Sequence, residues 1–282
     1  MPELPEVQTI INDLNRSLVG RKILTAWWDW SRMFKLPTKL RSLKRDIRSK
    51  RIVKVERRAK YIKIFLTADY LLAVHLKMTG RFYLVPQNLA TPKWRKEHYV
   101  HVMFSLDKKM VLAFSDVRKF GTMRFGKSVD IENLPEFKAL GPEPLAKGLT
   151  LDKFAQLITK PARAIKQVLM DPKIIVGIGN IYSDEALWLS KIHPLRKANA
   201  LKSGEIKKLF INIKKVLRKS LNLRGTSSRD YRDLSGQRGN YYDQRLVYHR
   251  EGEQCRRCKA KIKRLRLGGR SAHFCPRCQK AG

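Results

Sequence analysis

Apolar residues near the start of the chain recur at the spacing of an amphipathic helix. Val7, Ile10, Ile11, Leu14 and Leu18 follow the pattern i, i+3, i+4, i+7 and i+11, which places them on one face of a helix. The sequence therefore predicts one helix directly after the opening residues.

The pattern changes to alternating apolar and polar positions between Lys22 and Val129. Runs such as RIVKVERRAKYIKIFL, YVHVMFSL and KMVLAFSD are typical of short strands separated by turns. Many short strands in succession indicate a β-sandwich or a flattened barrel. We therefore expect a β-sandwich domain, with its N-terminal helix, over residues 2–132.

Helical periodicity follows the proline- and glycine-rich segment LPEFKALGPEPLAKG, which predicts a linker over residues 133–148. Helices are expected over Asp152–Met170, Ser183–Lys191 and Ser203–Asn222, the last with Ser203 as a candidate N-cap. These elements predict a helical domain over residues 149–245.

Residues 224–245, at the end of this helical domain, are polar and contain three glycines. Such a segment predicts a long mobile loop. The remaining residues, 246–282, contain every cysteine of the chain and form the last expected domain.

The charge of the chain is far from balanced. Lys and Arg number 61 against 24 Asp and Glu, a formal net charge of +37, which predicts a polyanionic partner. Nucleic acid is favoured because each neutralised phosphate releases condensed counterions. A membrane surface is the competing polyanion, but no stretch reaches the ~18 apolar residues of a spanning helix. The acidic N-terminus also lacks the basic and apolar regions of a secretory signal, so we expect a cytoplasmic protein.

The cysteines form two Cys-x-x-Cys pairs, Cys255 with Cys258 and Cys275 with Cys278, separated by 16 residues. In a reducing compartment this clustering favours a metal over disulfides. Four thiolates complete a tetrahedral Zn²⁺ site without a further ligand, so the predicted site is closed and structural. His273 lies near Cys275 but is expected to belong to the hairpin or to face a phosphate.

The residues between the two cysteine pairs, KAKIKRLRLGGRSAHF, are strongly basic, and no acid follows Glu253. They could form a solvated surface. Charge and metal together favour a clamp on the DNA backbone, with Arg270 near the tip of a β-turn.

A glycine turn precedes the helix expected at Ser183. The stretch DPKIIVGIGNIYSDEALW places Gly177, Gly179 and Asn180 immediately before that helix, where backbone N–H groups can bind phosphate. Such a turn often serves only packing, but in a basic chain it is similar to helix-turn-helix DNA binding.

The opening stretch, MPELPEV, has two interpretations. Loss of Met1 would expose the secondary amine of Pro2, and a terminal amine with a pKa of about 7.7–8.0 is partly an unprotonated nucleophile at neutral pH. Glu3 and Glu6 would then supply carboxyls for proton transfer and for stabilising a cation. The alternative is ordinary helix capping, which favours proline and glutamate in a first turn.

Six motifs occur in an order that favours the first interpretation: PELPEV, RRAKY, HLKMTG, DVRKFG, GIGNIYSDEAL and GGRSAHFCPRCQ. With them the chain resembles the formamidopyrimidine-DNA glycosylase family over nearly its whole length. The resemblance implies a two-domain α+β fold, with a β-sandwich, a helix-two-turn-helix domain and a β-hairpin zinc finger. It also implies a bifunctional repair enzyme that removes 8-oxoguanine and formamidopyrimidines from duplex DNA and cleaves the abasic strand by β,δ-elimination.

The resemblance implies residue roles as well. Pro2 would attack C1′ of the damaged nucleotide, Glu3 would assist ring opening and proton transfer, and Glu6 would support it. Lys60, which would hold a phosphate beside the reacting nucleotide, and Arg270 would complete the catalytic set with Pro2 and Glu3. Further contacts with DNA phosphates would come from His75, Asn180, Tyr248 and Arg264. Without the resemblance, Lys60 could be one strand lysine among many, and His75 could be a histidine of the hydrophobic core.

Three more residues match the family's intercalating set. An extrahelical base leaves a hole in the stack. Met78 and Phe120 would fill it as apolar wedges, while Arg118 would address the orphaned cytosine. Without the resemblance, Met78 and Phe120 would be interpreted as core residues. The glycine-containing loop would close over the extrahelical base.

The chain departs from the family pattern at Ala59 and Lys77, where glycine is more usual, and at Ala272, where a hydroxyl residue is usual. The catalytic set is intact. The resemblance further implies one structural Zn²⁺ per subunit, no organic cofactor, a monomer, and association with a bacterial-type nucleoid.

Two alternatives remain. One is an endonuclease VIII-like glycosylase for oxidised pyrimidines. Two features argue against it: PELPE in place of PEGPE, and the set of Met78, Arg118 and Phe120. The other is a noncatalytic nucleic-acid-binding zinc protein, which does not account for the terminal proline and glutamates.

Overall fold

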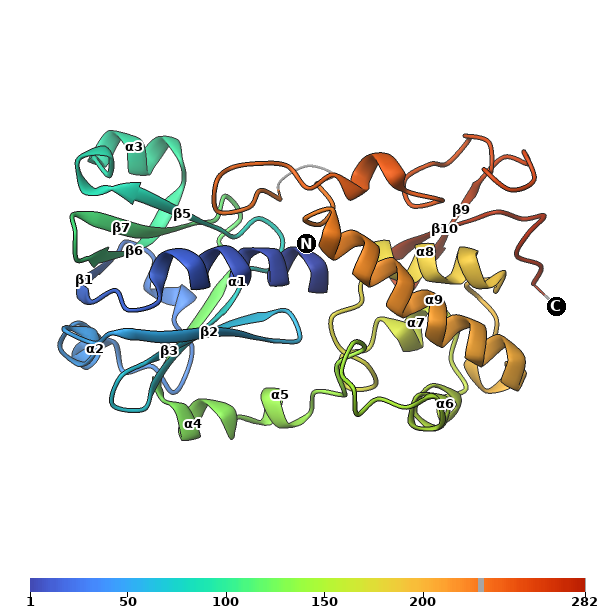
Figure 1. Ribbon diagram of the computed structural model, residues 1–282, viewed down its shortest axis with the longest axis horizontal. Helices are drawn as coiled ribbons and strands as arrows, with labels where there is room; N and C mark the ends of the chain where they lie inside the picture. The colour runs from blue at the N-terminus through green and yellow to red at the C-terminus, as the bar shows by residue number, and fades with distance from the viewer. Residues whose placement is uncertain (228–230, 282) are drawn as a thin grey trace. The chain divides into compact units, whose positions relative to one another are not determined.

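The computed structural model describes residues 1–227 and 231–281 (Figure 1). Residues 228–230, part of the mobile loop predicted at 224–245, lie outside the described residues. No helix within the described ranges is long and apolar enough to cross a membrane.

The chain forms two compact units. The first consists of Met1–Lys138 together with Arg224–Gly239, and the second of Ala139–Leu223 and the residues from Asn240 onward. We call Arg224–Gly239 the return segment, because it follows the helices of the second unit in sequence but packs with the first unit.

The described part of the first unit contains two four-stranded antiparallel sheets (Figure 1). One has the order β1-β6-β7-β5, with strands β1 Ile23–Trp28, β6 Val100–Leu106, β7 Met110–Ser115 and β5 Arg81–Pro86. The other has the order β2-β3-β4-β8, with strands β2 Ile52–Arg58, β3 Tyr61–Leu66, β4 Tyr70–His75 and β8 Thr122–Lys127. The sandwich predicted from the alternating pattern is confirmed.

Both sheets contribute to one hydrophobic core. Along β3, Ile62, Ile64 and Leu66 are buried and alternate with half-buried residues, as expected for a strand with one face in the core. Helix α1 (Leu4–Leu18) adds its apolar face to the same core and packs mainly on β2. The predicted N-terminal helix is therefore confirmed.

Helix α1 begins with a capping box. The Glu3 side chain accepts from the backbone N–H of Glu6, and the Glu6 carboxylate accepts from the backbone N–H of Glu3 at 2.8 Å. Pro5 lies in the first turn, where its missing N–H removes no helical hydrogen bond. Capping thus describes the geometry of the opening motif, and it orders the residues next to Pro2.

Short helices interrupt the region that the pattern predicts as mostly strand. They are α2 Leu40–Ile47 and α3 Pro92–Glu97. Two more follow at and beyond the end of this region, α4 Ser128–Glu132 and, in the predicted linker, α5 Pro135–Lys138. Helix α3 has a recognisable start, since Thr91 Oγ1 accepts from the backbone N–H of Trp94 at 3.2 Å and Pro92 follows the cap.

Among its described residues, the second unit contains the α-helices α6 Leu151–Thr159, α7 Ile165–Leu169, α8 Asn180–Ser190 and α9 Ser203–Asn222. It also contains the hairpin of β9 Lys263–Leu267 with β10 Arg270–Phe274. The prediction of one continuous helix over Asp152–Met170 is wrong. Helix α6 ends at Thr159, because Pro161 has no N–H to donate to the carbonyl of Leu157 and so cannot continue the helix. The N-cap of α9 is Lys202, one residue before the predicted Ser203.

Candidate active site

The N-terminal residues of the first unit are buried although they lie at the end of the chain. Pro2 is buried, Glu3 and Glu6 are only 2% and 1% exposed, and Met1 is 49% exposed. Two carboxylates are thus held beside a proline in a chain of large positive charge. Burial of this kind requires polar partners.

Glu6 has such partners on both of its oxygens. Oε2 accepts from the backbone N–H of Glu3 at 2.8 Å, and Oε1 accepts from the backbone N–H of Thr226 in the return segment at 2.7 Å. The Glu6 carboxylate therefore connects the residue after Pro2 to a segment more than 200 positions away in the sequence.

Lys60 lies in the two-residue turn between β2 and β3, where Arg58 pairs with Tyr61. Ala59 precedes it with φ +55°, a left-handed conformation that favours glycine. The Arg57 guanidinium donates to the Ala59 carbonyl at 3.0 Å and thereby supports the turn. The departure from glycine at residue 59 leaves the turn that presents Lys60 intact.

His75 ends β4, directly across from Tyr61. Its Nδ1 accepts from the backbone N–H of Lys77 at 3.0 Å, so the proton of the neutral ring lies on Nε2. Burial, followed by the charges of Lys77, Lys60 and Arg124, lowers the pKa of His75 to about 3. At neutral pH His75 is therefore an uncharged donor close to Lys60.

Met78, Arg118 and Phe120 form one exposed cluster from two turns. Met78 and Phe120 are 43% and 51% exposed, so composition alone would have placed them wrongly in the core. The Arg118 guanidinium lies 4.8 Å from the centre of the Phe120 ring, and its Nη1 lies 3.1 Å from the Met78 sulfur. The structure thus brings the three residues of the expected intercalating set together.

Asp116 organises both turns of this cluster. Its buried carboxylate accepts from the Thr79 hydroxyl and from the backbone N–H groups of Arg118 at 3.2 Å and Gly121 at 2.6 Å. Asp116 was not predicted as a site residue, although it opens the DVRKFG motif.

In the second unit, Asn180 is the first residue of α8, after the N-cap Gly179, and Gly177 has φ +82°. The predicted glycine turn before a helix is therefore present. Among the described residues, the Asn180 side-chain oxygen is buried and has no hydrogen-bond partner. An unsatisfied polar atom at a helix start is a position where a ligand can bind.

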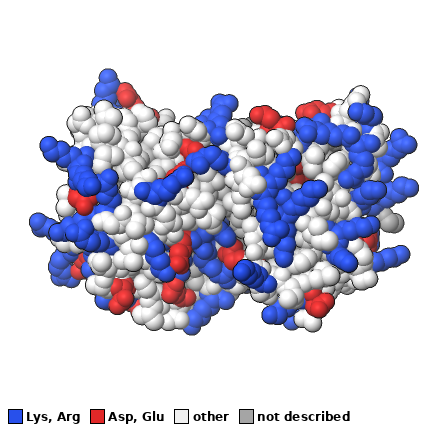
Figure 2. All heavy atoms as spheres, viewed as in Figure 1, with Lys and Arg blue, Asp and Glu red and all other residues white. Residues whose placement is uncertain are grey.

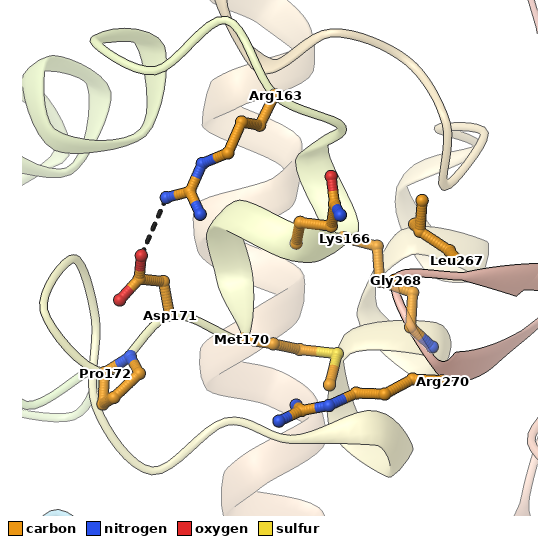
Figure 3. A pocket seen from close by; sticks show the side chains of 9 residues that line it. Arg163, Lys166, Met170, Asp171, Pro172, Leu267, Gly268 and Arg270 are labelled. Atoms are coloured by element: carbon orange, nitrogen blue, oxygen red, sulfur yellow. Dashed lines mark hydrogen bonds and ion pairs between the residues drawn. The ribbon is translucent and has the colours of Figure 1, made fainter.

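Arg270 directly follows the Gly268–Gly269 turn of the β9–β10 hairpin, as predicted. It is exposed and lines a pocket of about 250 Å³ together with Arg163, Gln167 and Met170 (Figure 3). Arg163 in this pocket is paired with Asp171 at 2.7 Å. Arg270 therefore presents its charge from the end of a tight two-residue turn.

A buried ion pair fixes the same hairpin. The Lys166 ammonium donates to Asp184 and, at 2.8 Å, to the carbonyl of Ser271. Asp184 also accepts from the backbone N–H of His273 at 2.9 Å, and the His273 ring lies 3.1 Å from it. Neither Lys166 nor Asp184 was predicted as a site residue, and His273 faces Asp184.

Arg264 and Tyr248 have different surroundings from Arg270. Arg264 is exposed on β9 and donates to the Ser271 hydroxyl at 2.9 Å. Tyr248 is buried and stacks on His249 with ring centres 4.2 Å apart. The fully buried Glu185 accepts from the backbone N–H of Tyr248 at 3.0 Å, and burial raises the pKa of the Glu185 carboxyl.

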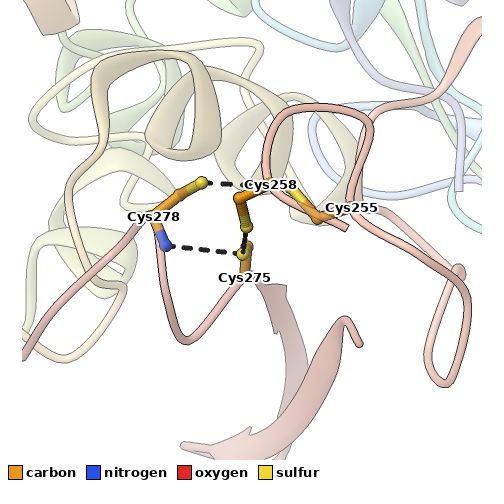
Figure 4. A group of neighbouring side chains, drawn as sticks. All are labelled: Cys255, Cys258, Cys275 and Cys278. Atoms are coloured by element: carbon orange, nitrogen blue, oxygen red, sulfur yellow. Dashed lines mark hydrogen bonds between the residues drawn. The ribbon is translucent and has the colours of Figure 1, made fainter. Parts of the chain in front are cut away.

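The four cysteines converge into one cluster (Figure 4). All four sulfurs lie within 4.8 Å of one another, and Cys258 and Cys275 are separated by 3.3 Å. A tetrahedral Zn²⁺ with Zn–S bonds of about 2.3 Å places sulfurs about 3.8 Å apart. The cluster therefore fits a structural zinc.

On the molecular face seen in Figure 2, Lys and Arg side chains are spread widely and acidic side chains are fewer. Surface of this kind attracts nucleic acid irrespective of sequence.

Comparison with known proteins agrees with this geometry. Residues 1–123 match the model of the formamidopyrimidine-DNA glycosylase N-terminal domain, residues 140–232 that of its H2TH domain, and residues 252–281 a zinc finger found in FPG and IleRS. The chain is 42% identical over 281 residues to the formamidopyrimidine-DNA glycosylase of Herpetosiphon aurantiacus, covering 99% of this chain and 100% of the relative.

Solved structures show the same likeness. A Lactococcus lactis FPG mutant in complex with Fapy-dG-containing DNA is 35% identical, with a TM-score of 0.91, and the match covers 99% of this chain and 100% of that one. MutM in complex with DNA that contains carbocyclic 8-oxo-G is 36% identical, with a TM-score of 0.89 and the same coverage.

Proposed function

Because this chain belongs to the formamidopyrimidine-DNA glycosylase family, we propose that it excises oxidised purines, 8-oxoguanine and formamidopyrimidines, from duplex DNA and then cleaves the abasic strand. The observation that carries the proposal is the buried N-terminus, where Pro2 lies beside Glu3 and Glu6. A noncatalytic binding protein has no need to bury two carboxylates there.

Pro2 is the proposed nucleophile. After Met1 is removed, the nitrogen of Pro2 is a secondary amine whose lone pair attacks C1′, while the bond to the damaged base breaks and the base leaves with the bonding electrons and takes up a proton. While Met1 is attached, that nitrogen belongs to an amide and is not nucleophilic.

Glu3 is the proposed proton donor and acceptor at the sugar ring. Protonation of the ring oxygen opens the sugar and leaves a cationic Schiff base on Pro2. Loss of a C2′ proton then expels the 3′ phosphate, and loss of a C4′ proton expels the 5′ phosphate. Glu6, whose two oxygens accept backbone N–H groups, supports Glu3 and Pro2.

The remaining site residues are proposed to bind DNA. The phosphate contacts are Lys60, His75, Asn180, Tyr248, Arg264 and Arg270. Met78 and Phe120 fill the space that the extrahelical base leaves, and Arg118 contacts the orphaned cytosine. The neutral Nε2–H of His75 donates to phosphate as an uncharged group. Asn180 donates through its side-chain NH2, because the amide oxygen and the phosphate are both acceptors.

We further propose one structural zinc per chain, no organic cofactor, action as a monomer, and a cytoplasmic, nucleoid-associated location. Bound zinc would hold the four thiolates together and stabilise the finger. It would take no part in the reaction.

The experiment that tests the function compares duplexes with 8-oxoguanine opposite cytosine and with an oxidised pyrimidine. We expect faster excision of the purine, and strand ends that carry phosphate on both sides of the gap. Cleavage of only the pyrimidine duplex would support the endonuclease VIII-like alternative. Binding without cleavage of either would support a noncatalytic protein.

A further inference from the structure

The return segment begins at a residue with an unusual backbone. Arg224 has φ +59°, which is disfavoured for a residue with a Cβ. Its side chain makes compensating bonds: Nη2 donates to Asp13 of α1 at 2.7 Å and to Asp233 of the return segment at 2.7 Å. Asp13 and Asp233 are buried, so one guanidinium joins two buried carboxylates from distant parts of the sequence.

The residues after Arg224 lie directly on Glu6. Gly225 has φ +88°, and a Cβ at that position would lie 2.9 Å from Oε1 and 3.0 Å from Cγ of Glu6. The next residue, Thr226, donates its backbone N–H to Glu6 Oε1 at 2.7 Å. The ion pairs of Arg224 therefore lie two residues from the hydrogen bond that holds Glu6.

Asp233 is itself fixed within the return segment. Its Oδ1 accepts from the backbone N–H groups of Ser235 at 3.0 Å and Gln237 at 2.8 Å. In addition, the Tyr231 hydroxyl donates to the Arg224 carbonyl at 3.1 Å. Arg224 is therefore bound to a carboxylate that the backbone of Ser235 and Gln237 also holds in place.

We propose that Arg224 is a positioning residue for the reaction. By joining Asp13 to Asp233, it holds Gly225 and Thr226 against Glu6, whose other oxygen holds the backbone N–H of Glu3 beside Pro2. This inference rests on the proposed function. It assigns to the Arg224 side chain a role in the rate of covalent chemistry and no role in binding DNA.

The test uses the full-length, zinc-loaded chain with Pro2 exposed, in wild-type form and as Arg224→Gly, Arg224→Lys and Arg16→Ala. Glycine accepts the left-handed backbone, so Arg224→Gly removes the ion pairs and leaves the turn intact. Urea unfolding shows whether the variant remains stably folded. Arg16 is the matched control, because it also pairs with Asp13 but is 69% exposed and belongs to α1.

Borohydride trapping on 8-oxoguanine DNA under single-turnover conditions gives the rate, and titration of the same duplex gives the affinity. We expect the rate of Arg224→Gly to fall about tenfold or more, since small misplacements of reacting groups are costly, with unchanged affinity and salt dependence. Arg224→Lys should recover part of the rate, and Arg16→Ala should match the wild type.

Two results would overturn the inference. One is a wild-type rate in Arg224→Gly, and the other is a loss of affinity with a shallower salt dependence, which would identify Arg224 as a phosphate contact. Failure of the wild-type chain to form any adduct would instead contradict the proposed function, so the two failures are distinguishable.

Discussion

Lys166 and Asp184 form an ion pair sealed from solvent, with side chains 1% and 0% exposed. Lys166 lies on α7 and Asp184 on α8, and through Ser271 and His273 the pair also holds the hairpin strand that starts at Arg270. A buried pair of this kind is strongly destabilised when only one partner is removed.

We therefore predict that Asp184→Asn lowers the free energy of unfolding by about 3–5 kcal/mol, because it leaves the Lys166 charge buried without its counterion. Urea denaturation measures the change. Arg163→Ala, which breaks the half-exposed pair with Asp171, is the control and should cost about 1 kcal/mol or less. Equal, small losses in both variants would contradict the inferred importance of the buried pair.

The low pKa of His75 predicts a pH dependence of stability. The folded pKa is about 3, against an ordinary value of 6.5, so between these values the unfolded state binds a proton that the folded state does not. The free energy of unfolding must then fall as pH falls through this window, by up to about 1.4 kcal/mol per pH unit. Above the upper value His75 contributes no slope.

His75→Gln removes this contribution. Urea unfolding at several pH values should show a shallower decline for the variant than for the wild type between about pH 6 and pH 4. Parallel curves for the two proteins would show that His75 titrates normally in the folded state.

Loss of zinc from the finger is expected to weaken DNA binding more than it affects the chemical step. Cys255→Ser should release the metal and disorder the hairpin that bears Arg264 and Arg270, so affinity for DNA falls and the logarithmic salt slope decreases by about one to two. Metal analysis and salt titrations measure both changes. Lys280→Ala, a surface change beside the finger, should keep the metal, whereas unchanged zinc content in Cys255→Ser would refute the ligand set.

The exposed cluster of Met78, Arg118 and Phe120 predicts a substrate-dependent defect. Phe120→Ala should slow excision of 8-oxoguanine from duplex DNA about tenfold. Without the Phe120 ring in the base stack, less of the free energy lost on removing the damaged base is recovered. Cleavage at a preformed abasic site should change little, since no base must leave. Leu89→Ala, another exposed apolar side chain, is the control, and equal losses on both substrates would argue against a wedge.

Local patterns predicted much of this molecule. The α1 face, the alternation along β3 and the two cysteine pairs depend on residues close in sequence, and each is found as expected. The exposed positions of Met78 and Phe120 could be predicted only from the family motifs. An apolar residue in a strand region gives no local indication that it faces solvent.

Long-range partners could not be predicted in the same way. Among 61 Lys and Arg residues, nothing near Lys166 marks it as the cation that Asp184 neutralises in the interior. Similarly, Arg224 looked like one more polar loop residue, and only the fold brings it to Asp13. Pro161 is an exception, because a proline is a local indication that a helix ends. The prediction of a continuous helix across Pro161 did not take this into account.

Covalent trapping tests directly whether the Pro2 nitrogen is the nucleophile. Zinc-loaded protein whose N-terminus is verified as Pro2 is treated with borohydride on DNA containing 8-oxoguanine opposite cytosine, beside the same protein with an N-terminal extension that keeps the Pro2 nitrogen in an amide. We predict a covalent adduct, mapped to Pro2 by mass spectrometry, only in the first sample. No adduct in the first sample, or an adduct mapped to a lysine, would show that the Pro2 nitrogen is not the nucleophile.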